Sequence, residues 1–280
     1  METTLNLQND CTKTDMECEN LSKNQSFHVE EFHIKNTISN ETIYGKIYIP
    51  NGTSKSWPTI IISHGYNGCC DSFLPECEYF ASHGYVAIAF DFCGGSTKSK
   101  SSMETTNMSL FTEKSDLMSV LAYAKKLDLV DNSKIFLLGG SQGGFVTALT
   151  AEEIEEQICG MILYYPAFCI PDNWRDNLSE LKQLPKIINF WDMPIGEPYF
   201  KCALSLNTFE EIGKFSKNVL IIHGDLDTVV PLSYSQKAVE LYPNAKLFVL
   251  ENEEHGFSEK GTNFSKRITL NFMNDIINNL

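Results

Sequence analysis

A single serine stands among four glycines where a long apolar run ends, and this pattern constrains the chain more than any other feature. Residues 135–138 read Ile-Phe-Leu-Leu, and residues 139–145 read Gly-Gly-Ser-Gln-Gly-Gly-Phe. The pattern predicts a strand, a sharp turn and a helix, with Ser141 at the turn. Glycine tolerates the crowded backbone of such a turn at low cost. The spacing G-x-S-x-G is typical of a turn that presents a nucleophilic serine, although an ordinary glycine-rich connection would also fit.

A nucleophilic serine requires a base and a group that orients the base, because a serine hydroxyl is a weak nucleophile at neutral pH. Downstream, an apolar strand runs into His-Gly-Asp-Leu-Asp at 223–227, which offers two carboxylates. Asp227 is the predicted acid because it lies further out on the loop. Asp225 directly follows a glycine and is expected to bind backbone N–H groups of its own turn. The predicted base is His255, which follows the next apolar strand.

The other histidines fit this role less well. Two of them end an apolar strand and precede a glycine, so we expect them to shape strand ends; these are His64 and His223. Three others lie in contexts that indicate no chemistry, and these are His28, His33 and His83. Only His255 has both the chain order and the loop setting that a base requires.

A site of this kind also needs two donors for the oxyanion of the tetrahedral intermediate. The strand predicted at 57–63 runs into His-Gly-Tyr, so the backbone N–H of Tyr66 is the first predicted donor. The N–H of Gln142, directly after the serine, is the second. All four motifs lie at the carboxyl ends of predicted strands.

Together these motifs resemble the α/β-hydrolase superfamily, from about Phe27 to the C-terminus. Segments 64–68, 141–144 and 224–231 are similar to the bacterial cinnamoyl (feruloyl) esterases and related small carboxylesterases. The resemblance implies hydrolysis of a small ester, of the hydroxycinnamoyl type, by Ser141, Asp227 and His255 without a cofactor. The chain departs from the family at Gly140, where histidine is usual, and at 91–94, which reads Asp-Phe-Cys-Gly. These departures leave the fine substrate assignment open.

Periodicity predicts one α/β domain over residues 27–280, preceded by a polar, flexible tail over residues 1–26. About eight mostly parallel strands flanked by helices are expected, at 27–35, 42–49, 57–63, 85–90, 134–138, 159–164, 219–222 and 246–250. A helix is expected over 109–127, where apolar residues recur at helical spacing. With 280 residues and 42% hydrophobic content, the chain can bury one large core.

The segment at about 167–216, after the sixth strand, breaks this alternation with several prolines and large aromatic residues. It is predicted to be a lid over the nucleophile, although a surface elaboration that packs its own aromatic rings is the alternative. The family resemblance implies that such an insert holds the phenolic end of the substrate. Tyr199 and Asp172 are the nearest matches for that role.

Composition excludes several partners. The net charge of −14 disfavours nucleic acid, and no basic helix or long apolar run indicates a membrane. The nine cysteines include no C-x-x-C pair, so neither a disulfide framework nor a metal site is predicted. The N-terminus lacks the pattern of a signal peptide, which leads us to expect a cytoplasmic enzyme. The oligomeric state stays open.

Fold and triad do not determine the substrate. A monoacylglycerol-type lipase and a serine peptidase on the same fold are therefore alternative functions. A catalytically silent binding protein is an alternative of another class, but the presence of all three triad residues disfavours it.

Overall fold

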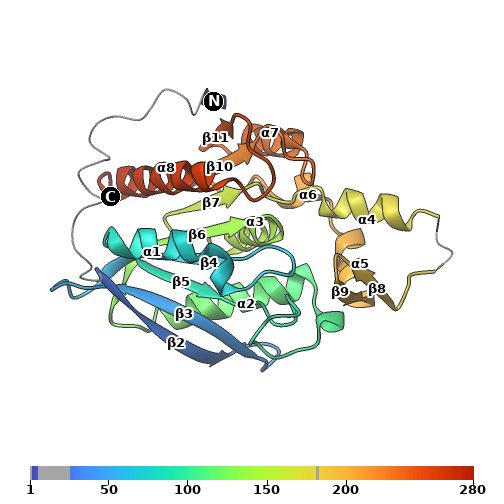
Figure 1. Ribbon diagram of the computed structural model, residues 1–280, viewed down its shortest axis with the longest axis horizontal. Helices are drawn as coiled ribbons and strands as arrows, with labels where there is room; N and C mark the ends of the chain where they lie inside the picture. The colour runs from blue at the N-terminus through green and yellow to red at the C-terminus, as the bar shows by residue number, and fades with distance from the viewer. Residues whose placement is uncertain (1, 6–25, 181–182) are drawn as a thin grey trace.

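The computed structural model describes residues 2–5, 26–180 and 183–280, and a nine-stranded sheet runs through them (Figure 1). Its strand order is β1-β11-β10-β7-β6-β4-β5-β3-β2. The strands are β1 (Glu2–Leu5), β2 (Phe27–Lys35), β3 (Thr42–Pro50), β4 (Trp57–Ser63), β5 (Val86–Phe90), β6 (Val130–Gly140), β7 (Gly160–Tyr164), β10 (Asn218–Gly224) and β11 (Ala245–Leu250). Strand β3 is antiparallel to both β2 and β5, and the other pairs are parallel. The predicted α/β fold, with eight mostly parallel strands, is confirmed.

Strand β1 is the one addition to the predicted sheet. Its residues lie within the segment 1–26 that was predicted to be a flexible tail, but they pair in parallel with Leu247–Leu250 of β11. The rest of that segment, residues 6–25, lies outside the described residues.

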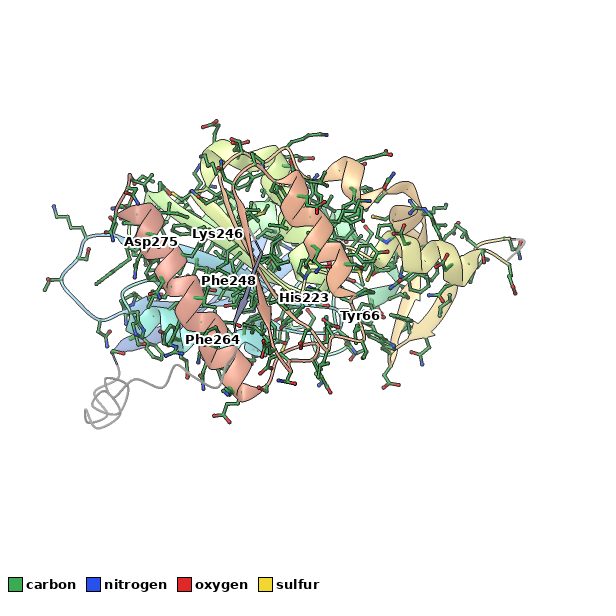
Figure 2. All side chains as sticks on the ribbon, turned by 90° about the horizontal axis from the view of Figure 1, so that it is seen from above. Tyr66, His223, Lys246, Phe248, Phe264 and Asp275 are labelled. Atoms are coloured by element: carbon green, nitrogen blue, oxygen red, sulfur yellow. The ribbon has the colours of Figure 1, made fainter. Side chains whose placement is uncertain are left out.

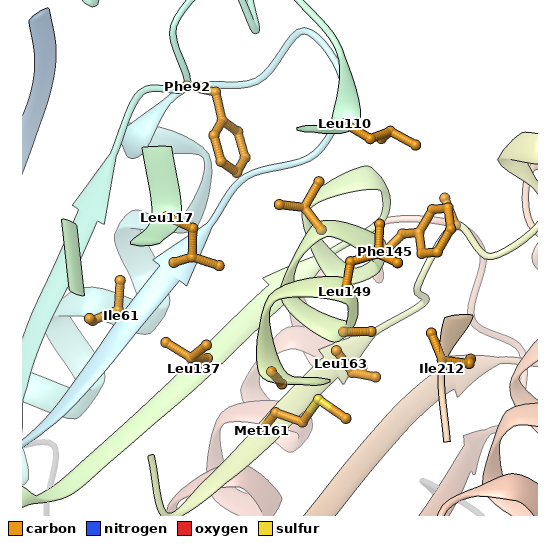
Figure 3. Close-up of a cluster of buried hydrophobic side chains, with 14 of the residues drawn as sticks. Ile61, Phe92, Leu110, Leu117, Leu137, Phe145, Leu149, Met161, Leu163 and Ile212 are labelled. Atoms are coloured by element: carbon orange, nitrogen blue, oxygen red, sulfur yellow. The ribbon is translucent and has the colours of Figure 1, made fainter. Parts of the chain in front are cut away.

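Helices cover both faces of the sheet because its central strands are apolar on both sides. In β4, Ile61 faces one core cluster, whereas Ile60 and Ile62 face the other. The flanking helices are α1 (Leu74–Ser82), α2 (Leu110–Ala124), α3 (Gln142–Ile154), α7 (Leu232–Leu241) and α8 (Glu259–Ile277). Helices α2, α3 and α7 pack on the Ile61 side, and Figure 3 shows part of that cluster. Helices α1 and α8 pack on the other side.

The insert lies between β7 and β10 and has its own secondary structure. It contains α4 (Ile170–Leu178), β8 (Ile187–Phe190), β9 (Met193–Gly196), α5 (Glu197–Ser205) and α6 (Thr208–Glu211). Strands β8 and β9 form an antiparallel hairpin. In Figure 1 α4, α5 and the hairpin project together from one side of the molecule. Several of its residues belong to the larger core cluster, including Trp174, Met193 and Phe200. The insert therefore packs as part of the main body.

The parallel direction of the central strands decides where polar loops can gather. The carboxyl ends of β4, β6, β10 and β11 meet at one edge of the sheet, and the predicted site residues follow these ends. No helix within the three described ranges is long and apolar enough to cross a bilayer.

Candidate active site

Ser141 occupies the turn between β6 and α3, as the glycine pattern predicts. Its backbone has φ 53° and ψ −123°, in a region that residues with a side chain rarely adopt. The flanking glycines are required by close contact. A Cβ at Gly139 would lie 2.2 Å from the carbonyl oxygen of Gly143, and a Cβ at Gly143 would lie 2.3 Å from that of His64. The turn is therefore sharp and held tightly against the strand and loop beside it.

The structure brings Ser141, His255 and Asp227 into one hydrogen-bonded series. His255 Nε2 lies 2.9 Å from Ser141 Oγ, and its Nδ1 lies 2.7 Å from Asp227 Oδ2. Because an ionised carboxylate only accepts, Nδ1 carries the proton, and Nε2 is left to accept the hydroxyl hydrogen. This is the geometry in which an imidazole can act as general base toward a serine.

Asp227 is held by more donors than the sequence indicates. Its Oδ1 accepts the backbone N–H groups of Val229 (2.9 Å) and Val230 (2.8 Å). Its Oδ2 accepts from His223 Nε2 at 3.1 Å, in addition to His255. Burial alone would raise the pKa of Asp227, but the hydrogen bonds from His223 and His255 outweigh it and hold the pKa well below its usual value. The carboxylate therefore stays ionised.

The contact between His223 and Asp227 was not predicted from the sequence, where the position of His223 before a glycine indicated only a strand-end role. Its ring is fully buried, with Nδ1 2.7 Å from the hydroxyl of Ser235 and Nε2 3.0 Å from the carbonyl oxygen of Val230. Because His223 Nε2 faces two acceptor oxygens, Asp227 Oδ2 and the carbonyl of Val230, the ring proton lies on Nε2. The four-residue spacing between His223 and Asp227 across one turn was the available signal. Figure 2 shows His223 and Tyr66 toward the insert side of the molecule.

Asp225 has the structural setting predicted for it but a different partner. Its Oδ1 accepts the N–H of Asn252 at 2.7 Å, on the loop that carries His255, and no N–H of its own turn. The backbone N–H of Leu226 in turn donates to the carbonyl oxygen of Glu253 at 3.0 Å. These bonds join the acid loop to the histidine loop, because the two loops follow adjacent parallel strands.

His64 shapes the loop on the other side of Ser141. It is buried, its Nδ1 lies 2.7 Å from the Gly65 carbonyl oxygen, and its Nε2 accepts the N–H of Phe92 at 3.0 Å. Burial lowers the pKa of His64, so the ring is neutral in this role. A Cβ at Gly65 would lie 3.1 Å from Ser141 Cβ, which places this loop directly beside the serine.

The two predicted oxyanion donors lie next to the serine in this arrangement. Tyr66 follows Gly65, and Gln142 is the first residue of α3, where helix N–H groups have no partner within the helix. Within the described part of the chain neither backbone N–H donates a hydrogen bond. Both amides are thus free to bind a developing negative charge.

A cavity of about 410 Å³ opens at Ser141 and is walled largely by the insert. Its aromatic lining comprises Tyr66, Trp174, Phe190, Trp191 and Tyr199. Helix α4 contributes three polar side chains to the lining, Asn173, Asp176 and Asn177. A small organic substrate with an apolar or aromatic part fits such a lining.

The two predicted substrate contacts have different positions: Tyr199 lies at the cavity and Asp172 does not. Tyr199 lines the cavity, but its hydroxyl donates to Gln142 Oε1 at 2.6 Å, so its single O–H is already in use. Asp172 lies outside the cavity lining. Its Oδ1 accepts from Arg175 at 2.8 Å, and its Oδ2 accepts from Tyr234 at 2.7 Å. Helix geometry explains why Asp172 lies elsewhere, because neighbouring residues of α4 face different sides of the helix. Asn173 and Trp174 line the cavity, and Asp172 does not.

Across the residues that the structure describes, no group of three or more His, Cys, Asp or Glu side chains is arranged to hold an ion. The seven cysteines in those ranges are all free.

Fold and site together define a protein of the α/β-hydrolase class. Residues 71–279 match the model of the prolyl oligopeptidase family, Peptidase_S9, and the chain belongs to that family. The structure is similar to Est1E from Butyrivibrio proteoclasticus, solved with ferulic acid bound. The two share a TM-score of 0.77 and 26% sequence identity, and the match covers 86% of this chain and 98% of that one.

Two curated relatives also match over most of the chain. Acylamino-acid-releasing enzyme 1 of Oryza sativa subsp. japonica is 21% identical over 249 residues, which cover 80% of this chain but 30% of the rice enzyme. The chain thus spans less than a third of that relative's length. The uncharacterised protein YqkD of Bacillus subtilis is 26% identical, over 79% of this chain and 72% of its own length.

Proposed function

We propose that this protein is a carboxylic-ester hydrolase that acts through an acyl-enzyme intermediate on Ser141. The observation that carries the proposal is the hydrogen-bonded series from Ser141 Oγ through His255 to Asp227, at the mouth of an aromatic cavity. Ser141 attacks the ester carbonyl while His255 Nε2 takes its proton, and Asp227 holds the imidazole in the required tautomer. The oxyanion is bound by the N–H groups of Tyr66 and Gln142. His255 then protonates the leaving alcohol.

Water completes the cycle. It occupies the position of the departed alcohol, gives its proton to His255 and attacks the acyl carbonyl, and Ser141 regains its proton when the acid leaves.

We propose an aromatic acyl group as the preferred substrate part, of the hydroxycinnamoyl type. Est1E, which shares the fold at 26% identity, binds ferulic acid, and the aromatic cavity lining in this chain suits a planar ring. Membership of the prolyl oligopeptidase family favours a serine peptidase as the second candidate. The two differ in the bond that is broken, an ester or an amide.

A fluorophosphonate probe tests the reaction class. We expect it to label Ser141 in the wild-type protein and to leave Ser141→Ala unlabelled, with ester turnover lowered on the order of 10⁶-fold in that variant. Labelling at another residue, or turnover by Ser141→Ala above a few percent, would exclude Ser141 as the nucleophile.

A matched substrate panel tests whether the protein cleaves esters or amides, and whether it prefers an aromatic acyl group. We expect methyl ferulate and p-nitrophenyl butyrate to be hydrolysed with a much higher kcat/KM than N-acetylalanine p-nitroanilide. The aromatic ester should also exceed its saturated, ring-free analogue of equal length. Faster cleavage of the anilide would favour the peptidase, and faster cleavage of a monoacylglycerol would favour the lipase.

A further inference from the structure

The side chains of the two proposed oxyanion residues both reach the insert. Tyr66 donates from its hydroxyl to the carbonyl oxygen of Phe190 at 2.8 Å, at the end of β8. Gln142 accepts at Oε1 from the hydroxyl of Tyr199, on α5, at 2.6 Å. Each proposed oxyanion residue is therefore hydrogen-bonded through its side chain to a different element of the same insert.

The Gln142 side chain is held at both ends. Its Nε2 lies 2.9 Å from both carboxyl oxygens of Glu113 on α2, and Glu113 is 1% exposed. Burial raises the pKa of Tyr199 well above its usual value, so its phenol keeps the proton that it donates to Oε1. The amide therefore has one favourable orientation, with its oxygen toward the insert and its nitrogen toward the main body.

The loop that carries Tyr66 is held in a similar way. The Tyr66 ring packs edge-on against Phe190, with ring centroids 5.4 Å apart, and Trp191 lies 6.2 Å away. The next residue, Asn67, accepts at its side-chain oxygen from the backbone and hydroxyl of Thr97 on the other side. The loop is thus fixed between the hairpin of the insert and the segment that follows β5.

We infer that the insert positions the oxyanion hole, with the hydroxyls of Tyr66 and Tyr199 as positioning groups. This inference rests on the ester-hydrolase function proposed above. Oxyanion donors stabilise charge that exists only in the transition state, so a small displacement of either N–H lowers kcat and leaves ground-state binding almost unchanged. On this view the insert does more than wall the substrate cavity: its docking sets the rate for every ester, whatever its acyl group.

The test removes one hydroxyl at a time while keeping each ring, in Tyr66→Phe and Tyr199→Phe. The matched control is Tyr234→Phe. The Tyr234 hydroxyl also bridges the main body and the insert, to Asp172 at 2.7 Å, but it touches neither oxyanion residue. Each variant loses one hydroxyl that donates between the main body and the insert, and only Tyr66→Phe and Tyr199→Phe lose a hydroxyl on or bonded to a proposed oxyanion residue.

With p-nitrophenyl acetate, whose acyl group is too small to fill the cavity, we expect kcat to fall roughly tenfold in Tyr66→Phe and in Tyr199→Phe. This is less than the 10²–10³-fold loss that follows removal of an oxyanion donor itself. KM should stay within about twofold. The Ki of a trifluoromethyl ketone, which forms an oxyanion on Ser141, should weaken in proportion to kcat/KM. Tyr234→Phe should keep the wild-type values.

Several results would overturn the inference. Unchanged kcat in both test variants, a change in KM alone, or an equal loss in Tyr234→Phe would show that the insert acts only on substrate binding or on general stability. Fluorophosphonate labelling of wild-type Ser141 separates this failure from failure of the proposed function. A labelled wild type with unaffected variants overturns the inference alone, whereas an unlabelled and inactive wild type overturns both.

Discussion

At the scale of single residues, Asp227 shows how one carboxylate can serve structure and chemistry together. Two backbone N–H groups bind Oδ1, and two imidazoles bind Oδ2. The backbone contacts belong to its own turn, whereas the His255 contact crosses to another loop. Asp225, two residues away, makes only a structural contact, to the N–H of Asn252. Two aspartates only two residues apart therefore have different roles: Asp227 holds the imidazole of His255, and Asp225 holds the backbone of the histidine loop.

Paired substitution should separate these two carboxylates. Asp227→Asn should lower kcat roughly 10⁴-fold, because an amide favours the wrong imidazole tautomer. Asp225→Asn should mainly lower the melting temperature, because it weakens a loop contact. Steady-state kinetics and thermal unfolding of both variants check the ranking, and the reverse order would identify Asp225 as the acid.

At the scale of elements, helices α2 and α3 are joined by a buried acid–amide contact beside the nucleophile. Glu113 of α2 and Gln142 of α3 are 1% and 2% exposed, and burial raises the pKa of Glu113 to about 8. The folded protein therefore holds a proton on Glu113 that the unfolded chain releases near its ordinary value of about 4.3. The free energy of unfolding should consequently fall as pH rises from about 4.3 to 8, because the folded state binds more protons in that range.

The variant Glu113→Gln tests this linkage, since glutamine keeps an acceptor for Gln142 and cannot ionise. We expect urea unfolding of the wild type to show a steeper loss of stability between pH 5 and pH 8 than the variant, by at most about 1.4 kcal/mol per pH unit. His33→Gln, on the exposed strand β2, serves as the control for general effects of substitution. Identical slopes in wild type and Glu113→Gln would show that Glu113 is ionised throughout.

At the scale of the whole molecule, one core cluster joins the insert to the main body. Phe145 of α3 packs edge-on against Phe168 at 5.7 Å, and Trp174 of α4 packs against Phe200 of α5 at 5.0 Å. All four belong to the larger of the two core clusters. Because they share buried surface, the insert and the sheet should lose their packing together.

The three tryptophans provide a direct measurement. Two of them, Trp174 and Trp191, lie in the insert, and the third is Trp57 of β4. In a Trp57→Phe variant, fluorescence reports the insert alone, whereas far-UV circular dichroism reports the whole fold. We expect the two urea transitions to coincide. A fluorescence transition at lower urea would show that the insert unfolds as a separate unit.

The sequence by itself determined the sheet of mostly parallel strands and the order in which Ser141, Asp227 and His255 occur, because strand periodicity and a glycine-framed turn are local properties of the chain. It also placed each of these residues at the end of a strand, and parallel strands bring such ends together. The side-chain partners were decided by tertiary structure. Tyr199 is hydrogen-bonded to Gln142, and Asp172 to Tyr234, only because the insert packs against the main body in this orientation. Hydrogen bonds between residues far apart in sequence depend on that packing, and no local pattern encodes it.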